Sequence, residues 1–208
     1  MHTPKNVDRY SFDEKKKIYF AFKRLFDLLF SIFGLIITMP VILVFGLFIK
    51  LETPGPVFFI QERVGQNGRN FNVLKLRSMG VDAEKNGAQW AEKNDPRVTK
   101  IGAFIRKTRI DEIPQFINVI KGDMSLVGPR PERPLFTEQF NKEIPGFIDR
   151  LAVKPGITGW AQVNGGYDIS PQEKLIHDRY YINNLNFVLD INIIIKTIKV
   201  CFTGSGAR

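Results

Sequence analysis

The stretch LFDLLFSIFGLIITMPVILVFGLFI, residues 25–49, decides how the rest of the chain can fold. Only Asp27, Ser31 and Thr38 interrupt its apolar character. A helix of about 20 apolar residues crosses the hydrocarbon core of a bilayer, so this run is long enough to enter a membrane. We therefore expect the other segments to be organised beside a membrane-embedded anchor.

Two features of this run favour a re-entrant anchor over a simple transmembrane helix. Pro40 removes one backbone hydrogen bond and clashes with the preceding turn, so we expect a kink at Met39-Pro40. Cationic residues favour the cytoplasmic side, and a hairpin would place both flanks there. The flanking cations are Lys15, Lys16, Lys17, Lys23 and Arg24 before the run, and Lys50, Arg63 and Arg69 after it. An ordinary spanning helix is the alternative, whereas a cleaved signal peptide would have a shorter, earlier apolar core.

Composition limits the classes of protein to which the chain can belong. Its 208 residues suffice for one domain, and 30 basic against 21 acidic residues give a net charge of +9. That charge suits a polyanion, but nucleic acid would not explain the apolar run, so we expect none. A single cysteine, Cys201, excludes an internal disulfide and suits a reducing compartment. The two histidines argue against a multi-histidine metal site.

The candidate chemistry lies in IGAFIRKTRIDEIPQFINVIKGDMSLVGPRP, residues 101–131, around the adjacent carboxylates Asp111 and Glu112. A helix is predicted to begin at this pair. Pro114 suits its first turn, because the first amides of a helix have no intrahelical acceptor and a residue without an N–H loses no hydrogen bond there. The helix dipole and the upstream cations should keep at least one carboxylate ionised. Such a carboxylate can be a nucleophile toward phosphorus or a metal ligand. Simple capping of the helix is an equal alternative. The predicted apolar face consists of Ile113, Phe116, Ile117 and Ile120.

A β-hairpin is predicted upstream of this stretch. Strand-like runs at 57–62 and 70–76 flank Gln66-Asn67-Gly68, and Asn-Gly is typical of a hairpin turn. Lys75 and Arg77 have the same parity, so both should lie on one face, where they either line a phosphate site or are solvated. Residues 79–95 are helical or irregular, with Trp90 either at a membrane interface or packed on the domain.

Turn-forming residues dominate the next segments. Gly128-Pro129-Arg130-Pro131 predicts a stiff extended turn, which would hold the Arg130 guanidinium rigidly for bidentate phosphate binding. Residues 154–166, KPGITGWAQVNGG, contain four glycines. So many glycines indicate that backbone lies close to a ligand or, more commonly, to another segment.

Three helices are predicted toward the C-terminus. The first covers 134–151 and is interrupted at Pro145-Gly146. The second covers 170–181, where Ser170, Pro171 and Glu173 form a capping box. The third, at 189–202, is amphipathic and too short to span a membrane. It either lies in the headgroup plane or packs its apolar face on the domain core.

The ordered set of motifs resembles the bacterial sugar transferases, the monotopic phosphoglycosyl transferases. The resemblance covers about residues 20–200, and several long motifs in the family's order make it highly specific. The matching segments are Lys23 to Asp27 (KRLFD), Pro40, Lys75 to Met79, Asp111-Glu112, Asn118 to Pro131 (NVIKGDMSLVGPRP), Lys154 to Gly165 (KPGITGWAQVNG) and Asp178 to Tyr181 (DRYY).

This resemblance implies an α+β, mostly helical protein. A polar lead-in, 1–22, would precede a re-entrant helix-break-helix anchor, 23–50. A compact cytoplasmic catalytic domain, 51–208, would then contain a small β-hairpin and amphipathic interfacial helices. The implied activity transfers a sugar phosphate from a UDP-sugar to polyprenyl phosphate, normally undecaprenyl phosphate, with Mg²⁺. It would take place at the cytoplasmic face of the bacterial inner membrane, as the first membrane step of exopolysaccharide or other glycan synthesis.

The resemblance also implies roles for individual residues. Asp111 would attack the β-phosphorus of the UDP-sugar, which gives an aspartyl phosphosugar and releases UMP. Polyprenyl phosphate would then attack that intermediate. Glu112 would help to hold Mg²⁺, and Lys75, Arg106 and Arg130 would clamp phosphate oxygens.

The chain departs from the family pattern at two places. Many relatives have serine before the anchor proline, whereas Met39 stands here, so Thr38 is the residue expected to bind the carbonyl that Pro40 frees. Many relatives also read QVNGR, whereas Gly166 replaces the arginine. Gln162 and Asn164 remain the candidates for nucleotide contact.

A function of another class is the alternative. A non-catalytic, membrane-anchored module could use the same cations to bind anionic lipid or a partner protein, and its binding would not depend on Asp111. Some relatives carry this domain at the end of a longer multi-span protein. The sugar, the glycan pathway and the oligomeric state are left open.

Overall fold

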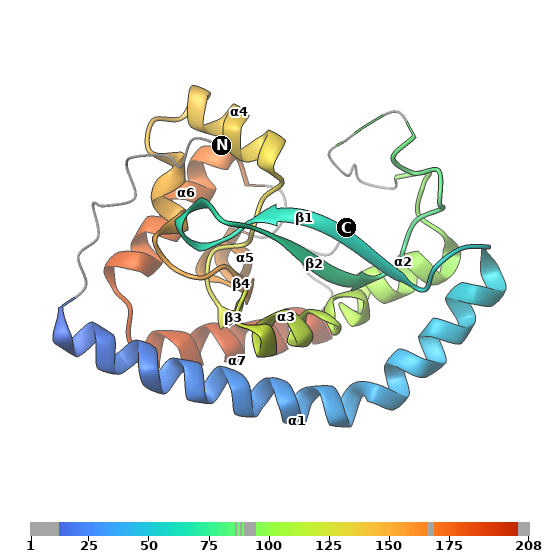
Figure 1. Cartoon of the computed structure of the whole chain (residues 1–208), viewed down its shortest axis with the longest axis horizontal. Helices are drawn as coiled ribbons and strands as arrows, with labels where there is room; N and C mark the ends of the chain where they lie inside the picture. Colours follow the sequence, from blue (N-terminus) through green and yellow to red (C-terminus); the bar gives the residue numbers. More distant parts are fainter. Residues whose placement is uncertain (1–12, 86, 88, 90–94, 166–168, 204–208) are drawn as a thin grey trace.

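The computed structural model describes residues 13–85, 87, 89, 95–165 and 169–203. A long bent helix, α1, runs along one edge of the molecule, and α3 and α7 lie beside it (Figure 1). The described part of the chain is mostly helical, with two small two-stranded sheets. The expected mixture of many helices with a small β-hairpin is confirmed.

Helix α1, Glu14–Glu52, begins earlier than the predicted anchor. The Asp13 carboxylate caps it by accepting a hydrogen bond from the Lys16 amide at 2.9 Å. Lys16 also donates through Nζ to the Leu185 carbonyl at 2.5 Å, which ties this end to the C-terminal region. Residues 14–22 are therefore part of the folded helix and not of a lead-in, while residues 1–12 lie outside the described part.

Pro40 lies inside α1, which continues through it as one helix. The predicted break is wrong, although α1 is visibly bent near its middle (Figure 1). Thr38 Oγ1 donates to the Gly34 carbonyl at 2.6 Å. The expectation that it binds the carbonyl freed by Pro40 is also wrong, because that carbonyl belongs to Ile36, four residues before the proline.

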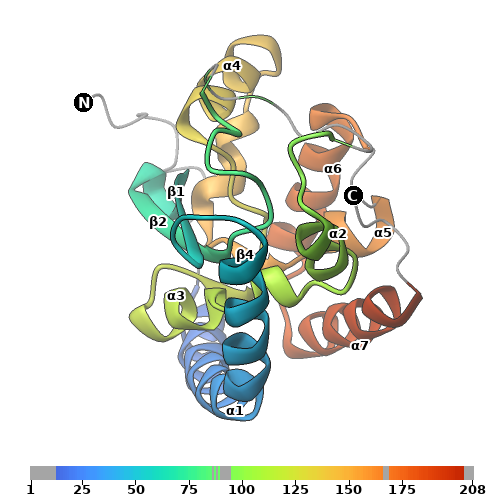
Figure 2. The same ribbon diagram turned by 90° about the vertical axis from the view of Figure 1, so that its right-hand side faces the viewer.

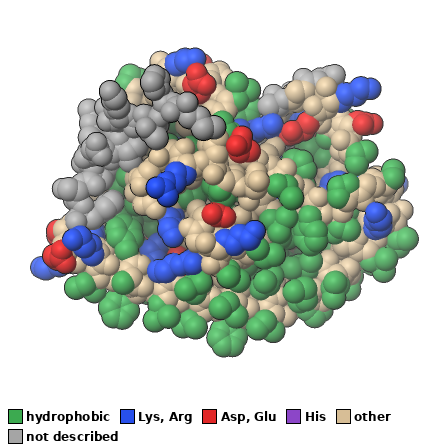
Figure 3. Space-filling view, viewed as in Figure 1, with side chains coloured by type: hydrophobic (Ala, Val, Ile, Leu, Met, Phe, Trp, Pro, Cys, Tyr) green, Lys and Arg blue, Asp and Glu red, His purple; other side chains and the backbone are tan. Residues whose placement is uncertain are grey.

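One stripe of α1 is polar and faces the rest of the protein. Lys23, Asp27 and Ser31, spaced four residues apart, are all buried. Lys23 pairs with Asp190 at 2.8 Å, and Asp27 accepts a hydrogen bond from the Leu126 amide at 3.1 Å. Ile42 and Ile49 of α1 are buried in the core, whereas its outer surface exposes apolar side chains, which line the lower edge of the space-filling view (Figure 3). They include Phe22, Leu25, Leu29, Phe33, Ile36, Ile37, Leu43, Val44, Leu47 and Leu51.

The predicted hairpin is confirmed. Strands β1, Phe58–Val64, and β2, Asn70–Leu76, are antiparallel, and Phe59 pairs with Lys75. Their connection is the short turn η2, Gln66–Gly68, where Asn67 has a φ of 56°. Asparagine tolerates this left-handed conformation better than most residues, which explains the Asn-Gly pair.

The segment around the carboxylate pair forms three helical pieces, and the predicted single helix that begins at the pair is divided between the last two. Helix α2, Lys100–Lys107, is followed by the 3-10 turn η3, Ile110–Glu112, and helix α3 covers Gln115–Lys121. Pro114 is the N-cap residue of α3, where its missing amide hydrogen removes no intrahelical hydrogen bond. The carboxylates consequently lie in η3 and not in the first turn of α3. Arg24 of α1 donates to the Val119 and Ile120 carbonyls near the end of α3.

The glycine-rich segment joins a small parallel sheet. Strand β3, Ser125–Val127, pairs with β4, Gly156–Thr158. A Cβ on Gly128 would lie 2.3 Å from the Lys154 carbonyl oxygen, and one on Gly156 would lie 2.1 Å from the Gly128 amide nitrogen. The glycines therefore allow two backbone segments to pack together. Trp160–Gly165 then forms a short helix, α5, which was not predicted.

The C-terminal helices match the predictions more closely. Helix α4, Pro134–Glu143, ends before the predicted interruption, and the 3-10 helix η4 covers Phe147–Ala152. Helix α6, Pro171–Asn183, begins with the Ser170 capping box, as predicted. Figure 2 shows α4 and α6 on the side of the molecule away from α1.

Helix α7, Phe187–Thr203, packs one side on the core, where Leu189 and Ile193 are buried near Tyr181. Val188 and Ile195 on its other side are exposed. Residues 79–95 include an isolated bridge between Met79 and Val98, whereas Trp90 lies outside the described residues.

Candidate active site

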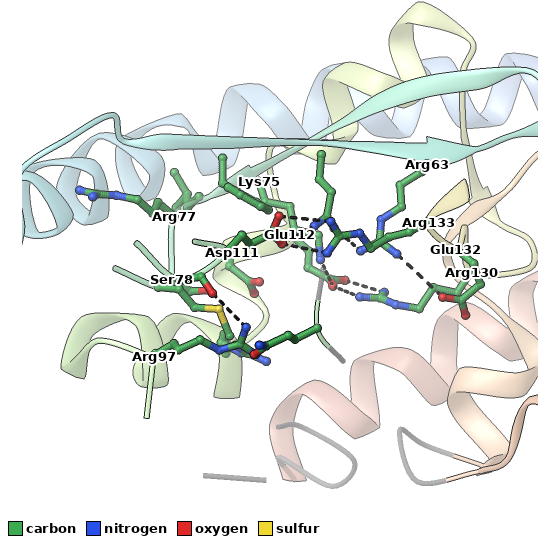
Figure 4. Close-up of a pocket in the computed structure, with 18 of the residues that line it drawn as sticks. Arg63, Lys75, Arg77, Ser78, Arg97, Asp111, Glu112, Arg130, Glu132 and Arg133 are labelled. Atoms are coloured by element: carbon green, nitrogen blue, oxygen red, sulfur yellow. Dashed lines mark hydrogen bonds and ion pairs between the residues drawn. The ribbon is translucent and has the colours of Figure 1, made fainter. Parts of the chain in front are cut away.

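A cavity of about 390 Å³ opens between the hairpin, the α2–η3 segment and the turn after β3 (Figure 4). Its volume lies in the range of small-molecule sites. Cations outnumber carboxylates in its lining, so it favours an anionic ligand. The lining cations are Arg63, Lys75, Arg77, Arg97, Arg106, Arg109, Arg130, Arg133 and Lys174, and the carboxylates are Glu84, Asp111, Glu112 and Glu132.

The two predicted carboxylates lie together at this cavity, and each is only 7% exposed. Lys75 Nζ is 2.9 Å from Glu112 Oε1, and Arg130 Nη2 is 2.6 Å from the same oxygen. Arg130 Nη1 lies 3.4 Å from Oε2. Strand β2, turn η3 and the turn after β3 therefore converge on Glu112 (Figure 4).

These partners decide the ionisation of Glu112. Burial by itself would raise the pKa of this carboxyl, because the charged form loses hydration. Arg130 and Lys75 outweigh burial and hold the pKa of Glu112 well below its usual value. Glu112 is therefore an ionised carboxylate at neutral pH.

Asp111 lies in a different environment. Its Oδ1 is buried and has no hydrogen-bond partner among the described residues. Burial raises the pKa of Asp111 to about 6; the nearby Lys75 opposes this shift, and the charge of Glu112 adds to it. At neutral pH Asp111 is still mostly ionised, but its charge is poorly compensated. A carboxylate of this kind can attack an electrophile or bind a cation.

The other predicted cations differ in where they point. Arg106 lines the cavity and is close enough to favour the ionised form of Asp111. Arg77 lines the cavity on the same strand face as Lys75, but its guanidinium donates to the carbonyls of Pro54 and Thr53 at 2.6 and 2.9 Å. Figure 4 shows it directed away from the carboxylates. Arg77 therefore ties the exit of α1 to β2.

The oxygens of the carboxylate pair fit a Mg²⁺ site in which a bound substrate supplies the remaining ligands of the ion. Mg²⁺ is usually held by one or two carboxylates together with substrate phosphates. The described residues contain no group of three or more acidic, histidine or cysteine side chains that could form a complete protein site. The unpartnered Oδ1 of Asp111 is an available oxygen donor, whereas Lys75 and Arg130 already engage Glu112.

The family model of the bacterial sugar transferases matches residues 18–204. The chain belongs to this family. The matched range includes all of the segments that form the cavity.

Several relatives of this bacterial sugar transferase are named as transferases of a sugar phosphate to undecaprenyl phosphate. It is 50% identical over 194 residues to the UDP-N-acetylgalactosamine-undecaprenyl-phosphate N-acetylgalactosaminephosphotransferase of Aeromonas hydrophila, which covers 92% of this chain and 46% of the relative. Identity is 42% over 190 residues to the UDP-glucose:undecaprenyl-phosphate glucose-1-phosphate transferase of Escherichia coli (strain K12), with coverage of 89% and 41%. The chain thus spans less than half the length of these two relatives.

A third relative is of similar length. The Bacillus subtilis (strain 168) protein provisionally named undecaprenyl-phosphate N-acetylgalactosaminyl 1-phosphate transferase is 59% identical over 145 residues. The match covers 70% of this chain and 81% of that protein.

The two candidate nucleotide residues of this sugar transferase lie apart. Gln162 lines the cavity and donates through Nε2 to the Ile157 carbonyl at 2.9 Å. Asn164 is not in the cavity lining; it binds the Trp160 carbonyl and Lys196. Gly166, the position at which the resemblance led us to expect an arginine, lies outside the described residues.

Sequence reasoning did not find several lining residues of this sugar transferase, namely Arg63, Arg97, Glu132, Arg133 and Lys174. Arg63 could have been found, because the hairpin register places it on the same strand face as Phe59 and its partner Lys75. The others lie on turns and helices whose approach to the cavity depends on long-range packing.

Proposed function

We propose that the protein transfers a sugar 1-phosphate from a UDP-sugar to a polyprenyl phosphate, normally undecaprenyl phosphate, and releases UMP. The observation that carries this proposal is the ionised, poorly compensated Asp111 beside a cation-rich cavity. The printed names of the relatives supply the substrate class. N-Acetylgalactosamine phosphate and glucose phosphate are therefore the first groups to test.

In the first step an Asp111 carboxylate oxygen attacks the β-phosphorus of the UDP-sugar. The bond between that phosphorus and the bridging oxygen breaks, and the electron pair leaves on UMP. In the second step an oxygen of polyprenyl phosphate attacks the phosphorus of the aspartyl phosphosugar, and the bond to Asp111 breaks. A covalent route allows one site to serve a water-soluble and a lipid substrate in turn.

The cations of the cavity support this chemistry by binding phosphate oxygens. Lys75 and Arg130 already converge on the Glu112 carboxylate, and Arg106 lies near Asp111. Glu112 and Asp111 would hold Mg²⁺ together with the diphosphate. When bound, the ion would supply positive charge that offsets the charge on the diphosphate and improves UMP as a leaving group.

A re-entrant position of α1 in the cytoplasmic leaflet of the bacterial inner membrane completes the proposal. α1 is the described helix that is long and apolar enough to cross a membrane. Its 39 residues extend roughly 58 Å at 1.5 Å per residue, about twice the hydrocarbon core of a bilayer. Both of its ends bind the same domain: Lys16 contacts Leu185, and Glu52 accepts hydrogen bonds from the Lys100 and Ile101 amides. A helix crossing the bilayer would separate these contacts.

The proposal is tested by measuring UMP release from a panel of UDP-sugars with polyprenyl phosphate and Mg²⁺. The wild-type protein should release UMP with at least one sugar, whereas Asp111→Asn should release none. Asp82→Asn is the matched control, because Asp82 is exposed and outside the cavity lining. UMP release by Asp111→Asn at the wild-type rate would refute the nucleophile. A wild-type protein that binds anionic lipid but releases no UMP from any sugar would instead support the non-catalytic alternative.

A further inference from the structure

The DRYY motif, Asp178–Tyr181, has no part in the cavity. These residues are absent from the cavity lining, although they belong to the segments that carry the family resemblance. Asp178 and Tyr181 are each 1% exposed and lie one turn apart on the buried face of α6. Their role must therefore be exerted through other residues.

The turn that carries Arg130 offers the connection. Each backbone carbonyl from residue 129 to 132 accepts a hydrogen bond from another segment. The donors are the Gly156 amide to Pro129 at 3.0 Å, Arg150 Nη2 to Arg130 at 2.9 Å, Arg63 Nη1 to Pro131 at 3.1 Å and the Val64 amide to Glu132 at 2.9 Å. The carbonyl of Arg130 itself is thus bound by a buried guanidinium.

Asp178 holds that guanidinium in place. Asp178 Oδ2 accepts from Arg150 Nε at 2.9 Å and from Nη2 at 2.6 Å. Nη2 is the same nitrogen that donates to the Arg130 carbonyl. One turn later, the Tyr181 hydroxyl lies 3.2 Å from the carbonyl of Val127, the last residue of β3, and 2.8 Å from Asp190 Oδ1, and its single proton serves both acceptors. Helix α6 therefore contacts both ends of the chain segment from Val127 to Arg130, directly at Val127 and through Arg150 at Arg130.

We propose that Asp178 and Tyr181 position Arg130 for phosphate binding, with Arg150 as the connecting residue. None of the three touches the reacting atoms, so they are positioning residues. Their effect is to fix the backbone from which the Arg130 guanidinium reaches the carboxylate pair. This inference rests on the proposed function for its kinetic consequence, because a displacement of about 1 Å in a catalytic group can cost 10²-fold in rate.

A neighbouring pair provides the matched control. Arg179, inside the same motif, pairs with Asp149 at 2.7 Å and thereby also joins α6 to η4. No hydrogen bond of Arg179 to the turn at 128–132 is present among the described contacts. Arg150→Lys and Arg179→Lys are the same chemical change between the same two elements. Only the first removes a donor from the Arg130 carbonyl.

The test compares these variants in UMP release and in hydrogen exchange of peptides covering residues 127–133. Arg150→Lys should lower kcat about tenfold or more and speed exchange of these peptides, whereas Arg179→Lys should do neither. In an Arg130→Ala background, Arg150→Lys should cause no further loss, because a residue that acts through Arg130 has nothing left to position. If Arg150→Lys does not fold, Asp178→Asn, which retains an acceptor for Arg150, takes its place in every measurement.

Two results would overturn the inference. One is equal kcat and equal exchange in Arg150→Lys and Arg179→Lys. The other is a decrease in kcat from Arg150→Lys that is equally large in the wild-type and in the Arg130→Ala background. Because hydrogen exchange does not depend on activity, it tests the positioning role independently of the proposed function. A wild-type protein without UMP release refutes the function, while faster exchange at 127–133 in Arg150→Lys alone would still support the positioning role.

Discussion

At the residue scale, the two adjacent carboxylates differ because their partners differ. Glu112 has two cations within hydrogen-bond distance, whereas Asp111 Oδ1 is buried without a partner among the described residues. Their pKa values are accordingly shifted in opposite directions. Two titratable groups with opposite shifts at one cavity are a common sign of separate chemical roles.

The raised pKa of Asp111 predicts that this residue destabilises the folded protein at neutral pH. The folded pKa of about 6 exceeds the ordinary value of 3.8. The penalty is therefore absent below pH 3.8, grows between pH 3.8 and 6, and is complete above about 6. Asp111→Asn should remove it and raise the free energy of unfolding at pH 8 by roughly 2–3 kcal/mol. Thermal or denaturant unfolding without divalent metal measures this gain.

The gain from Asp111→Asn should shrink as the pH falls from 6 toward 4, because the wild-type aspartate is then protonated in the folded state. Asp82→Asn serves as the control, since Asp82 is exposed and its replacement should leave stability nearly unchanged at each pH. An Asp111→Asn protein no more stable than the wild type at pH 8 would contradict the buried, poorly compensated charge.

At the scale of elements, the sheet β3–β4 shows why the glycine-rich segment is needed. This sheet places the turn with Arg130, because Gly128 follows β3 and its amide donates to the Thr158 carbonyl of β4 at 2.9 Å. The close approach leaves no room for a Cβ at Gly128 or Gly156. The obstructing atoms belong to the backbone, so they cannot move aside as a flexible side chain would.

Gly156→Ala should therefore destabilise the protein by about 1–3 kcal/mol or more. Its new Cβ would lie 2.1 Å from the Gly128 amide nitrogen and force the two strands apart. Gly80→Ala is the matched control, because no heavy atom lies within 4 Å of the corresponding Cβ. Chemical unfolding of both variants measures the difference, and equal stability would mean that the strands do not need this contact.

At the scale of the whole molecule, α1 is part of the same folded unit as the cavity. Its polar stripe is buried against α7 and β3, its Arg24 binds the end of α3, and its last residue, Glu52, caps α2. The apolar remainder of its surface is exposed along one edge (Figure 3). The cavity is thereby held at a constant position relative to the apolar edge, as the proposed transfer to a lipid substrate would require.

The attachment of both ends of α1 to one domain predicts that both lie on the cytoplasmic side of the membrane. In a Cys201→Ser background, Lys15→Cys and Arg69→Cys place single thiols at exposed positions in the first turn of α1 and beyond its C-terminal end. An impermeant maleimide should label neither in intact cells and both after permeabilisation. The cysteine-free protein is the control for background labelling. Labelling of one position in intact cells would show that α1 crosses the membrane.

The sequence by itself determined the features that depend on neighbouring residues. Asn67-Gly68 specified the hairpin, Ser170 with Glu173 specified the start of α6, and Pro145-Gly146 specified the end of α4. The carboxylate pair and Arg130 were found because they lie within one short stretch of recognisable motifs. Backbone sterics and capping act over a few residues, so a linear pattern contains the information they need.

Only the tertiary structure decided the features that depend on distant contacts. Lys16 pairs with the Leu185 carbonyl and Tyr19 with Asp190 of α7, which fixes residues 14–22 of the predicted lead-in as part of α1. The ion-pair partners of Glu112 come from two separate segments, β2 and the turn after β3, and Arg150 of η4 joins Asp178 to the Arg130 carbonyl. The reason is physical: hydrogen bonds and charge pairs between segments far apart in the chain depend on how the core packs, and no local pattern records that packing.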